Sequence, residues 1–336
     1  MPLLDGRDPT AIAAAARQLA DGGLLAFATE TVYGLGARAD QDPAVAAIFA
    51  AKGRPADHPL IVHVADWAQA APFVAWPDGG PPAALARLVD TCWPGPVTVI
   101  VPRAAGMGMA AAAGQPSIGL RCPAHPVAQA LLRAAAALGV PGVAAPSANR
   151  FGRVSPTCAA HVAQEFGPAL WLLDGGDCAL GIESAIIDLS RAAPVLLRPG
   201  VLTRAQLQAA LGQPLQDADA DAPRAPGTLA AHYAPAARLR LWPANALQQA
   251  LAGRPHTPAI LPPGLAVYSR RAGVAPAGVR WVAMADDPAA VAHDLFAVLR
   301  RLDAEGATEI WVEQPPAQPA WEGVADRLRR AATAAS

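Results

Sequence analysis

The chain is almost without lysine. Its 26 lysine and arginine residues include a single lysine, Lys52, which lies two residues before Arg54. A lysine in the last turn of a helix is ordinary when it carries only surface charge. In a composition that uses arginine almost everywhere else, however, surface charge alone would favour arginine. A compact ammonium and a planar guanidinium are not interchangeable against phosphate, so Lys52 is a candidate site residue.

Other scarcities exclude whole classes of protein. The four cysteines form no C-x-x-C pair, so neither a zinc site nor a disulfide framework is indicated. No uncharged apolar run approaches the ~18 residues of a membrane span, and the opening "MPLLDGRDPT" lacks the apolar core of a signal peptide. A net charge of −1 gives no general attraction to nucleic acid or anionic lipid. We expect a cytoplasmic protein with free thiols and no membrane partner.

Several motifs of common enzyme classes are also missing. The chain contains no G-x-x-x-x-G-K-[ST], no G-x-G-x-x-G after a strand, no G-x-S-x-G and no H-E-x-x-H. P-loop NTPases, conventional dinucleotide enzymes, serine hydrolases of the nucleophile-elbow type and zinc proteases are therefore disfavoured.

The 336 residues suffice for two domains, each with its own core. Helical patterns alternate with short apolar runs in the first part, which predicts an α/β domain with an open sheet. The predicted helices are 8–23, 43–52, 82–92, 125–138 and 157–166, and the predicted strands are 24–29, 60–64, 97–101, 143–145 and 185–189. Asp8 is the expected cap of the first helix, and the glycines of "VYGLGA" (32–37) predict a turn after the first strand. Thr203 and Gln206 predict a capping box for a helix that ends at Gly212.

The composition changes after residue 212. Residues 213–236 are rich in Pro, Asp and Gly with little apolar periodicity, which predicts a linker, and we expect this linker to act as a lid that closes over a site in the first domain when its ligands are bound. Strand-like runs at 239–242 and 308–313 flank a helix striped with apolar residues from 291 to 302, which predicts a smaller α/β domain. The expected divisions are 1–212, 213–236 and 237–336.

Polar clusters follow the apolar runs of the first domain, where ligands bind in open α/β sheets. The clusters are "ATETVYGLG" (28–36), "KGRPADHPLIVHV" (52–64), "SIGLRCPAH" (117–125), "APSANRFGRVSP" (145–156), "GIESAIID" (181–188) and "LLRPG" (196–200). Each has a plain alternative: a turn, a strand-end salt bridge, or an Asx or Ser turn. Together, cations, hydroxyls and glycine-rich turns indicate a pocket for a phosphorylated ligand plus a carboxylate.

With "WPGPVT" and "HYAP", these segments resemble the threonylcarbamoyl-AMP synthase family, the YrdC-like proteins, in order through residues 10 to 236. The tail is similar to the longer form of the family. The resemblance implies a YrdC-like domain, with a twisted open mixed β-sheet flanked by helices around a large cleft, and a small Rossmann-like α/β C-terminal domain.

The resemblance implies that L-threonine, bicarbonate and ATP give threonylcarbamoyl-adenylate and pyrophosphate. Mg²⁺ would be carried by ATP, with no metal bound by the protein itself. The product would pass to a tRNA threonylcarbamoyltransferase machinery that modifies tRNA beside the anticodon. Direct tRNA or RNA binding is left open.

Site residues carry over position by position. Phosphate stabilisation falls to Lys52 and Arg54. The ATP contacts would be Arg54, His58, Ser117, Ser147, Asn149, Ser155, Arg198 and Tyr233, the last folding back from the linker as this lid closes over bound ATP and threonine. The threonine contacts would be Thr31, His63, Arg121, Ala145 and Ser184, with Arg121 on the carboxylate, as bidentate geometry favours.

The chain departs from the family pattern at three positions. Ala28 stands where proline is usual, His58 where asparagine is usual, and Ala185 where threonine is usual. The departure at His58 bears on its ATP contact.

Two other functions compete with the synthase reading. A non-catalytic RNA-binding module fits poorly, because residues 1–212 carry 14 Lys and Arg against 15 acids. A carbamoyl-transfer enzyme of the hydrogenase-maturation type would carry zinc-finger modules, which the cysteine spacing does not offer.

Overall fold

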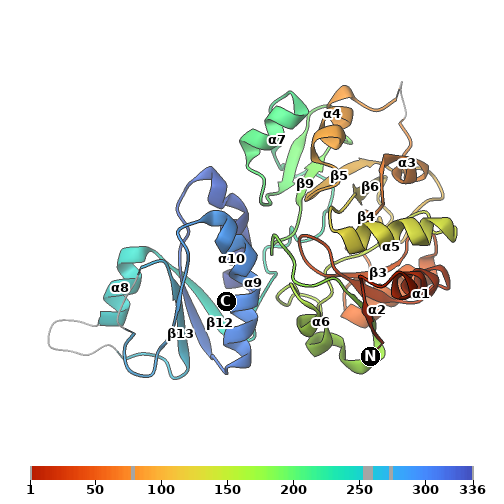
Figure 1. The fold of residues 1–336 in the computed structure, drawn as a ribbon. Coiled ribbons are helices and arrows are strands. Elements are labelled where there is room, and N and C mark those ends of the chain that lie inside the picture. Colours follow the sequence, from red (N-terminus) through yellow and green to blue (C-terminus); the bar gives the residue numbers. More distant parts are fainter. Residues whose placement is uncertain (1, 77–79, 253–259, 272–274, 335–336) are drawn as a thin grey trace. The chain divides into compact units, whose positions relative to one another are not determined.

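The computed structural model describes residues 2–76, 80–252, 260–271 and 275–334. The chain divides into two compact units. The first consists of Met1–Phe151 and Ser155–Thr228, and the second of Gly152–Val154 and Leu229–Ser336 (Figure 1).

The first unit is built on an eleven-stranded mixed sheet, counted over the described residues, with the order β1-β8-β2-β3-β7-β4-β6-β5-β9-β10-β11. Its strands are β1 (Leu3–Asp5), β2 (Leu25–Phe27), β3 (Gly34–Arg38), β4 (Ile61–His63), β5 (Val97–Pro102), β6 (Ser117–Arg121), β7 (Val143–Ala144), β8 (Trp171–Asp174), β9 (Ala185–Asp188), β10 (Val195–Arg198) and β11 (Gln216–Asp217). Parallel and antiparallel neighbours alternate irregularly across it, as expected for a mixed sheet.

Helices cover both faces of this sheet. They are α1 (Pro9–Ala20), α2 (Asp42–Lys52), α3 (Trp67–Ala70), α4 (Ala83–Cys92), α5 (Pro126–Ala137), α6 (Ala159–Phe166) and α7 (Arg204–Leu211), with 3-10 turns at Ala71–Phe73 and Gly167–Ala169. The larger core packs α2, α4, α6 and α7 on one face, and a second core packs α1 and α5 on the other.

Strand alternation decides which side chains reach each face. On β4 the larger core takes Val62, so Ile61 and His63 point to the opposite face. That second face is divided in three. Helices α1 and α5 cover the part over β2, β7 and β8, and Ala225 packs with isoleucines of β4, β5 and β9 at the other end. The part between them, here called the central strip, is covered by neither group.

The predicted local signals are confirmed at several helix ends. Asp8 caps α1 by accepting from Thr10 N at 2.9 Å, and Thr203 and Gln206 form the expected capping box of α7. The prediction of a turn at "VYGLGA" is wrong in part, because the residues from Gly34 on form β3. A Cβ at Gly36 would lie 2.7 Å from a methyl of Val143, so glycine lets β3 and β7 approach.

The second unit has a four-stranded, all-parallel sheet, counted over the described residues, with the order β12-β15-β13-β14. Its elements are β12 (Arg238–Trp242), α8 (Ala244–Ala252), β13 (Leu265–Ser269), β14 (Arg280–Ala283), α9 (Pro288–Ala304), β15 (Glu309–Glu313), a 3-10 turn (Pro319–Trp321) and α10 (Glu322–Thr333). The sequence predicted β12, α9 and β15. Strands β13 and β14 were missed, since their short runs lie between Pro- and Gly-rich stretches.

The predicted linker, 213–236, belongs to both units. Residues up to Thr228 pack with the first unit and residues from Leu229 with the second. Gln115 and Arg224 exchange two hydrogen bonds, of 3.0 and 3.1 Å, and Arg198 donates to Pro226 O at 2.9 Å. Leu215 also packs in the larger core, and Asp217 and Asp219 pair with Arg204 and Arg191. The sequence predicted only a linker here because such isolated anchors have no periodic signature, and its action as a lid stays a prediction.

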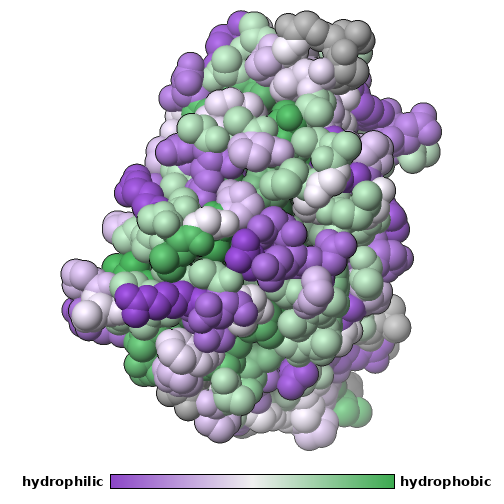
Figure 2. Space-filling model, turned by 90° about the vertical axis from the view of Figure 1, so that its right-hand side faces the viewer, coloured by the Kyte–Doolittle hydropathy of each residue, from purple (hydrophilic) through white to green (hydrophobic). Residues whose placement is uncertain are grey.

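Among the described residues, no helix is long and apolar enough to cross a membrane. The face drawn in Figure 2 interleaves hydrophilic and hydrophobic residues.

Candidate active site

Four predicted threonine contacts meet on or beside the central strip. Arg121 pairs with His63 of β4 on one side and with Thr98 of β5 on the other. Directly paired residues share a face, so these three side chains lie in a row. Ser184 extends the row, since its Oγ lies 2.8 Å from Thr98 Oγ1.

Arg121 is the centre of this row and is only 4% exposed. It donates from Nη1 to Thr31 Oγ1 at 2.9 Å, from Nη2 to Glu30 Oε1 at 2.6 Å, and from Nε to Gly95 O at 3.3 Å. A guanidinium has five N–H donors. Two therefore have no partner among the described residues, one on each terminal nitrogen, which is what capture of a carboxylate requires.

His63 is neutral at physiological pH. Burial, and then the charge of Arg121, lower the pKa of His63 to about 3. Its Nδ1 is buried and has no hydrogen-bond partner among the described residues. Its ring meets Phe27 edge-on, with centroids 6.2 Å apart. A neutral imidazole adds hydrogen-bonding capacity to the strip without a second positive charge.

Ser184 is held from two sides. Arg198 donates to Ser184 O from Nε at 3.1 Å and from Nη2 at 2.9 Å, and Thr98 meets the Ser184 hydroxyl. The hydroxyl is fully buried. Arg198, predicted as an ATP contact, thus fixes the backbone of a predicted threonine contact.

Lys52 ends α2 and is 3% exposed. Its Nζ donates at 2.5 Å to both Ser147 O and Asn149 O. Burial, and then the neighbouring charge of Arg54, lower the pKa of Lys52. An ammonium has three donors, so one N–H remains without a partner among the described residues. The solvated helix end is excluded, and Lys52 instead ties α2 to the loop after β7.

Arg54 and His58 lie against one aromatic ring. The guanidinium carbon of Arg54 lies 5.6 Å from the ring centroid of Phe151. The ring centroid of His58 is also 5.6 Å from the ring centroid of Phe151. Arg54 also donates to Pro59 O at 3.0 Å. Burial, and then Arg54, lower the pKa of His58. The structure therefore brings Arg54 and His58 together beside the loop that carries Ser147 and Asn149.

The remaining predicted residues occupy different parts of the molecule. Ser155 is fully buried and donates to Glu183 Oε1 at 2.5 Å. Ala145 packs in the core beneath α1 and α5. Ser117 begins β6 whereas Arg121 ends it, so the two lie at opposite ends of the strand but on the same face. His63 and Arg121 end β4 and β6, and Ser184 directly precedes β9, so this row lies at one end of neighbouring strands as the sequence predicted, and Ser117 is the exception.

Tyr233 belongs to the second unit. It is 1% exposed, stacks on Phe296 with centroids 5.5 Å apart, and has Arg327 over its ring. Its φ of +62° places it in the left-handed region, which is rare for a residue with a side chain. Its assignment to ATP stays a prediction.

Two residues at the site were not assigned from the sequence. Glu30 forms the ion pair with Arg121, and Thr98 bonds Ser184. Glu30 stands inside "ATETVYGLG", so its charge next to Thr31 was a signal. Thr98 lies within the apolar run "VTVIVP", where only strand alternation against Arg121 would single it out.

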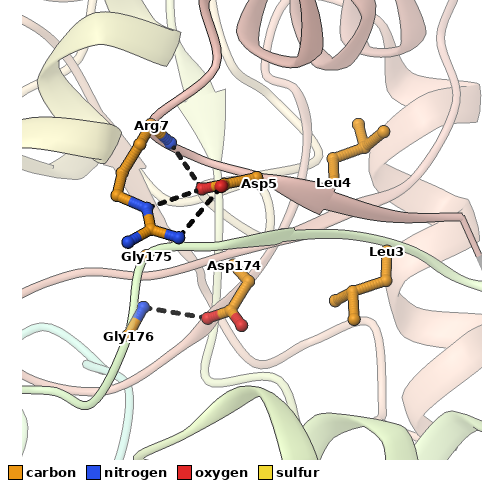
Figure 3. Close-up of a pocket in the computed structure, with 7 residues that line it drawn as sticks. All are labelled: Leu3, Leu4, Asp5, Arg7, Asp174, Gly175 and Gly176. Carbon is orange, nitrogen blue, oxygen red and sulfur yellow. Dashed lines mark hydrogen bonds and ion pairs between the residues drawn. The ribbon is translucent and has the colours of Figure 1, made fainter.

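A pocket of about 440 Å³ lies elsewhere, at the β1–β8 edge of the sheet. Figure 3 shows two interactions in this pocket: the ion pair in which Arg7 donates to both carboxylate oxygens of Asp5, and the hydrogen bond from Gly176 N to Asp174 Oδ1. Arg7 is exposed and none of the lining residues is a predicted site residue. Buried polar groups, rather than surface concavity, therefore identify the candidate site. In the described part of the chain, no group of three or more His, Cys, Asp or Glu is arranged to hold a metal ion.

Comparison with known proteins gives consistent matches along the chain. Residues 17–200 match a family model described as telomere recombination, and residues 202–333 match one described as the threonylcarbamoyl-AMP synthase C-terminal domain. The threonylcarbamoyl-AMP synthase of Bacillus subtilis is 41% identical, over 71% of this chain and 68% of that protein. That of Schizosaccharomyces pombe is 32% identical, over 92% and 85%.

Solved structures agree along nearly the full length. Sua5 of Pyrococcus abyssi, complexed with L-threonine, superposes with a TM-score of 0.84 at 32% identity, covering 99% of this chain and 97% of that one. A variant of the same protein, with a His–Tyr pair changed to alanines, gives the same TM-score at 31% identity.

Proposed function

The chain belongs to the threonylcarbamoyl-AMP synthase family, and from this premise we propose that it makes threonylcarbamoyl-adenylate and pyrophosphate from L-threonine, bicarbonate and ATP. The observation that carries this is the state of Arg121. It is buried and anchored by three bonds, yet keeps one N–H on each terminal nitrogen for a carboxylate. Neutral His63 and the Thr31 and Ser184 hydroxyls surround it with groups suited to a small polar amino acid.

The nucleotide would lie toward Lys52 and Arg54. Lys52 keeps one N–H, and a phosphate would stabilise its charged form against the effect of burial. Arg54, His58 and Phe151 make a cationic and aromatic group next to it. Of the carboxylates nearby, Glu30 pairs with Arg121 through one oxygen and Glu183 accepts from Ser155, and among the described residues no group of three or more His, Cys, Asp or Glu is arranged to hold a metal ion. Mg²⁺ prefers oxygen ligands, so it would be held by the ATP phosphates.

The chemistry asks for positioning more than for a strong base. Bicarbonate would give carbon dioxide by loss of hydroxide, and the neutral threonine nitrogen would add to it and lose a proton to form a carbamate. A carbamate oxygen would then attack the α-phosphate and release pyrophosphate. Holding both reactants in one geometry makes the step effectively unimolecular. Cations that meet the growing phosphate charge stabilise the transition state. Arg121 and Lys52 lie on adjacent parts of one unit and fit these two tasks.

The product and partners follow from the same proposal. A mixed anhydride of this kind would be passed to a threonylcarbamoyltransferase that modifies tRNA. The four free cysteines fit a reducing compartment, and we place the enzyme in the cytoplasm.

The test is pyrophosphate release from ATP, measured with and without L-threonine and with and without bicarbonate. Release should need both. Release that is independent of threonine would contradict the proposal, and so would the same rate with serine and threonine at low concentration.

A further inference from the structure

Glu30 is a buried carboxylate with only one oxygen engaged. It is 7% exposed, and its Oε1 accepts from Arg121 at 2.6 Å. Its Oε2 is buried and has no hydrogen-bond partner among the described residues. Leaving a buried charged oxygen without a donor is costly. A buried acceptor of this kind, next to the guanidinium of the strip, indicates that a donor arrives with the ligand.

The backbone around Glu30 is fixed before any ligand binds. Glu30 O accepts from Leu180 N at 2.8 Å. Thr29 Oγ1 accepts from the backbone N–H groups of Thr31 and Val32, both at 3.2 Å, and donates to Val32 O at 2.6 Å. These bonds hold the turn on both sides of Glu30. The carboxylate is therefore placed by the fold and not by the ligand, which is what a positioning group requires.

Tyr33 anchors the end of the same turn. Its hydroxyl donates to Asp174 Oδ1 at 2.7 Å and lies 2.8 Å from Gly176 O. Burial, and then the bond to Asp174, raise the pKa of Tyr33, so the phenol stays protonated and keeps this anchor. The turn cannot shift without breaking it.

The charges of the strip match a zwitterion. Arg121 supplies one positive charge and Glu30 one negative charge, and His63 is neutral. An α-amino acid carries its carboxylate and its amino group on one carbon, so the two groups are held close together. A substrate carboxylate on the open N–H groups of Arg121 would bring its amino group toward the carboxylate that Arg121 itself holds.

We propose that Glu30 is a positioning residue, whose Oε2 accepts a hydrogen bond from the amino group of the amino-acid substrate. The inference rests on the proposed function, because it adds a residue to the same site. Arg121 then binds the substrate carboxylate and Glu30 binds the substrate amino group. Glu30 therefore selects α-amino acids over carboxylic acids that have no nitrogen. An ammonium, a neutral amine and a carbamate all retain at least one N–H, so this bond persists as the nitrogen reacts.

The experiment compares two ligands in two variants. L-Threonine is the substrate, and (R)-3-hydroxybutanoate keeps its carboxylate and hydroxyl but has no amino group. Glu30→Gln keeps the shape and an acceptor for Arg121 but presents an NH₂ donor in place of Oε2. The matched control is Asp40→Asn, whose carboxylate pairs with Arg38 Nη2 at the same 2.6 Å, at the far end of β3.

The readouts are KM for threonine and for ATP, and the inhibition constant of (R)-3-hydroxybutanoate, all from pyrophosphate release. Glu30→Gln should raise KM for threonine about 10- to 100-fold, the range of a lost charge-assisted hydrogen bond. The inhibition constant and KM for ATP should stay within about threefold, and Asp40→Asn should change none of the three.

Equal weakening of both carboxylates in Glu30→Gln would show that Glu30 acts only by orienting Arg121, and the inference would be wrong. An unchanged KM for threonine would also overturn it. If Glu30→Gln does not fold, the wild type decides alone: a preference for threonine over (R)-3-hydroxybutanoate below threefold would contradict the proposal. A wild type that releases no pyrophosphate with threonine and bicarbonate instead refutes the proposed function.

Discussion

A buried glutamate pairs with an arginine in each unit, Glu30 with Arg121 and Glu313 with Arg270, and the two pairs differ in what they leave open. In the second unit, Glu313 accepts from Arg270 Nη2 at 2.5 Å on one oxygen, and from Ser269 Oγ at 2.5 Å and Arg270 N at 3.1 Å on the other. In the first unit, Glu30 accepts on one oxygen only. The Glu313 carboxylate is complete within the protein, which marks a structural pair, whereas the Glu30 pair is built to receive a ligand.

The same contrast extends beyond the pairs. The sheet of the second unit is all parallel and continuous over the described residues, and its helix α9 buries seven side chains. The sheet of the first unit leaves a strip between α1 and α5 and the segment that carries Ala225. Polar side chains are buried on that strip, between the two apolar clusters. A row of buried polar groups that interrupts the apolar packing of a sheet face is therefore the structural signal of the site.

The largest effect that could break this comparison is expected at Lys52. Lys52→Arg keeps the charge, but the larger planar group cannot bond two carbonyls at 2.5 Å and still present a point-like donor. We expect at least a ~100-fold loss of turnover, a barrier change of about 2.7 kcal/mol. Pyrophosphate release measures it, and thermal melting separates it from the overpacking cost of about 1–3 kcal/mol. Turnover near the wild-type rate would remove the reason for assigning Lys52 to the site.

The next effect separates the two arginines. Arg121→Gln should raise KM for threonine about 30-fold or more and leave KM for ATP nearly unchanged, since one charge-assisted carboxylate contact is lost. Arg270→Gln should change neither constant and should lower only the melting temperature. Steady-state kinetics of both variants tests this. If Arg121→Gln weakens ATP and threonine alike, Arg121 is a structural ion pair like Arg270.

A smaller effect concerns the segment shared between the units. Ala225→Asp would place a charge against Ile61, Ile100 and Ile186, so it should release residues 213–228 from the first unit. We expect severalfold faster limited proteolysis in that segment, and slower cleavage in the wild type when ATP and threonine are both present. Ala220→Asp, at an exposed position on the same segment, is the control. Cleavage that ignores substrates would show that the segment is only a spacer.

The smallest effect is the pH dependence of stability. The pKa of His63 is lowered to about 3, so the unfolded chain binds a proton below about pH 6.5 and the folded first unit does not. The contribution of neutral His63 to the free energy of unfolding is fully present above pH 6.5 and is lost as the pH falls from there toward 3. At pH 5 the loss is about 2 kcal/mol. Urea unfolding followed by hydrogen exchange of first-unit peptides should show this loss, and His63→Gln should reduce it.

In the second unit, the loss of stability that comes from Glu313 begins at a lower pH than the loss from His63. Burial alone would raise the pKa of Glu313, but the bonds from Ser269 and Arg270 outweigh it and lower that pKa. Its contribution to stability is therefore present above the ordinary glutamate pKa of 4.5 and lost only as the pH falls below it. Second-unit peptides that lose protection at the same pH as first-unit peptides would remove this difference between the units.

The sequence by itself determined the local elements whose signals are local. The apolar stripe of α9, the caps at Asp8 and Thr203, and the short runs of β4, β5 and β9 were predictable because periodicity and capping act within a few residues. The scarcity of lysine in the composition made Lys52 a candidate site residue. The ordered motifs supplied the family and, through it, the candidate residues.

Only the tertiary structure decided which of those residues meet, and how. Arg121 and Glu30 are 91 residues apart in the chain, and Lys52 bonds a loop almost one hundred residues away. Such contacts depend on strand order and register, which no local pattern encodes. β3 was predicted as a turn because its glycines serve a close approach to β7, and the packing of residues 213–228 was not predicted because their anchors are isolated backbone groups, ion pairs and single apolar side chains. That Glu30 Oε2 has no donor among the described residues can be recognised only when the fold has placed the neighbouring groups that could donate to it.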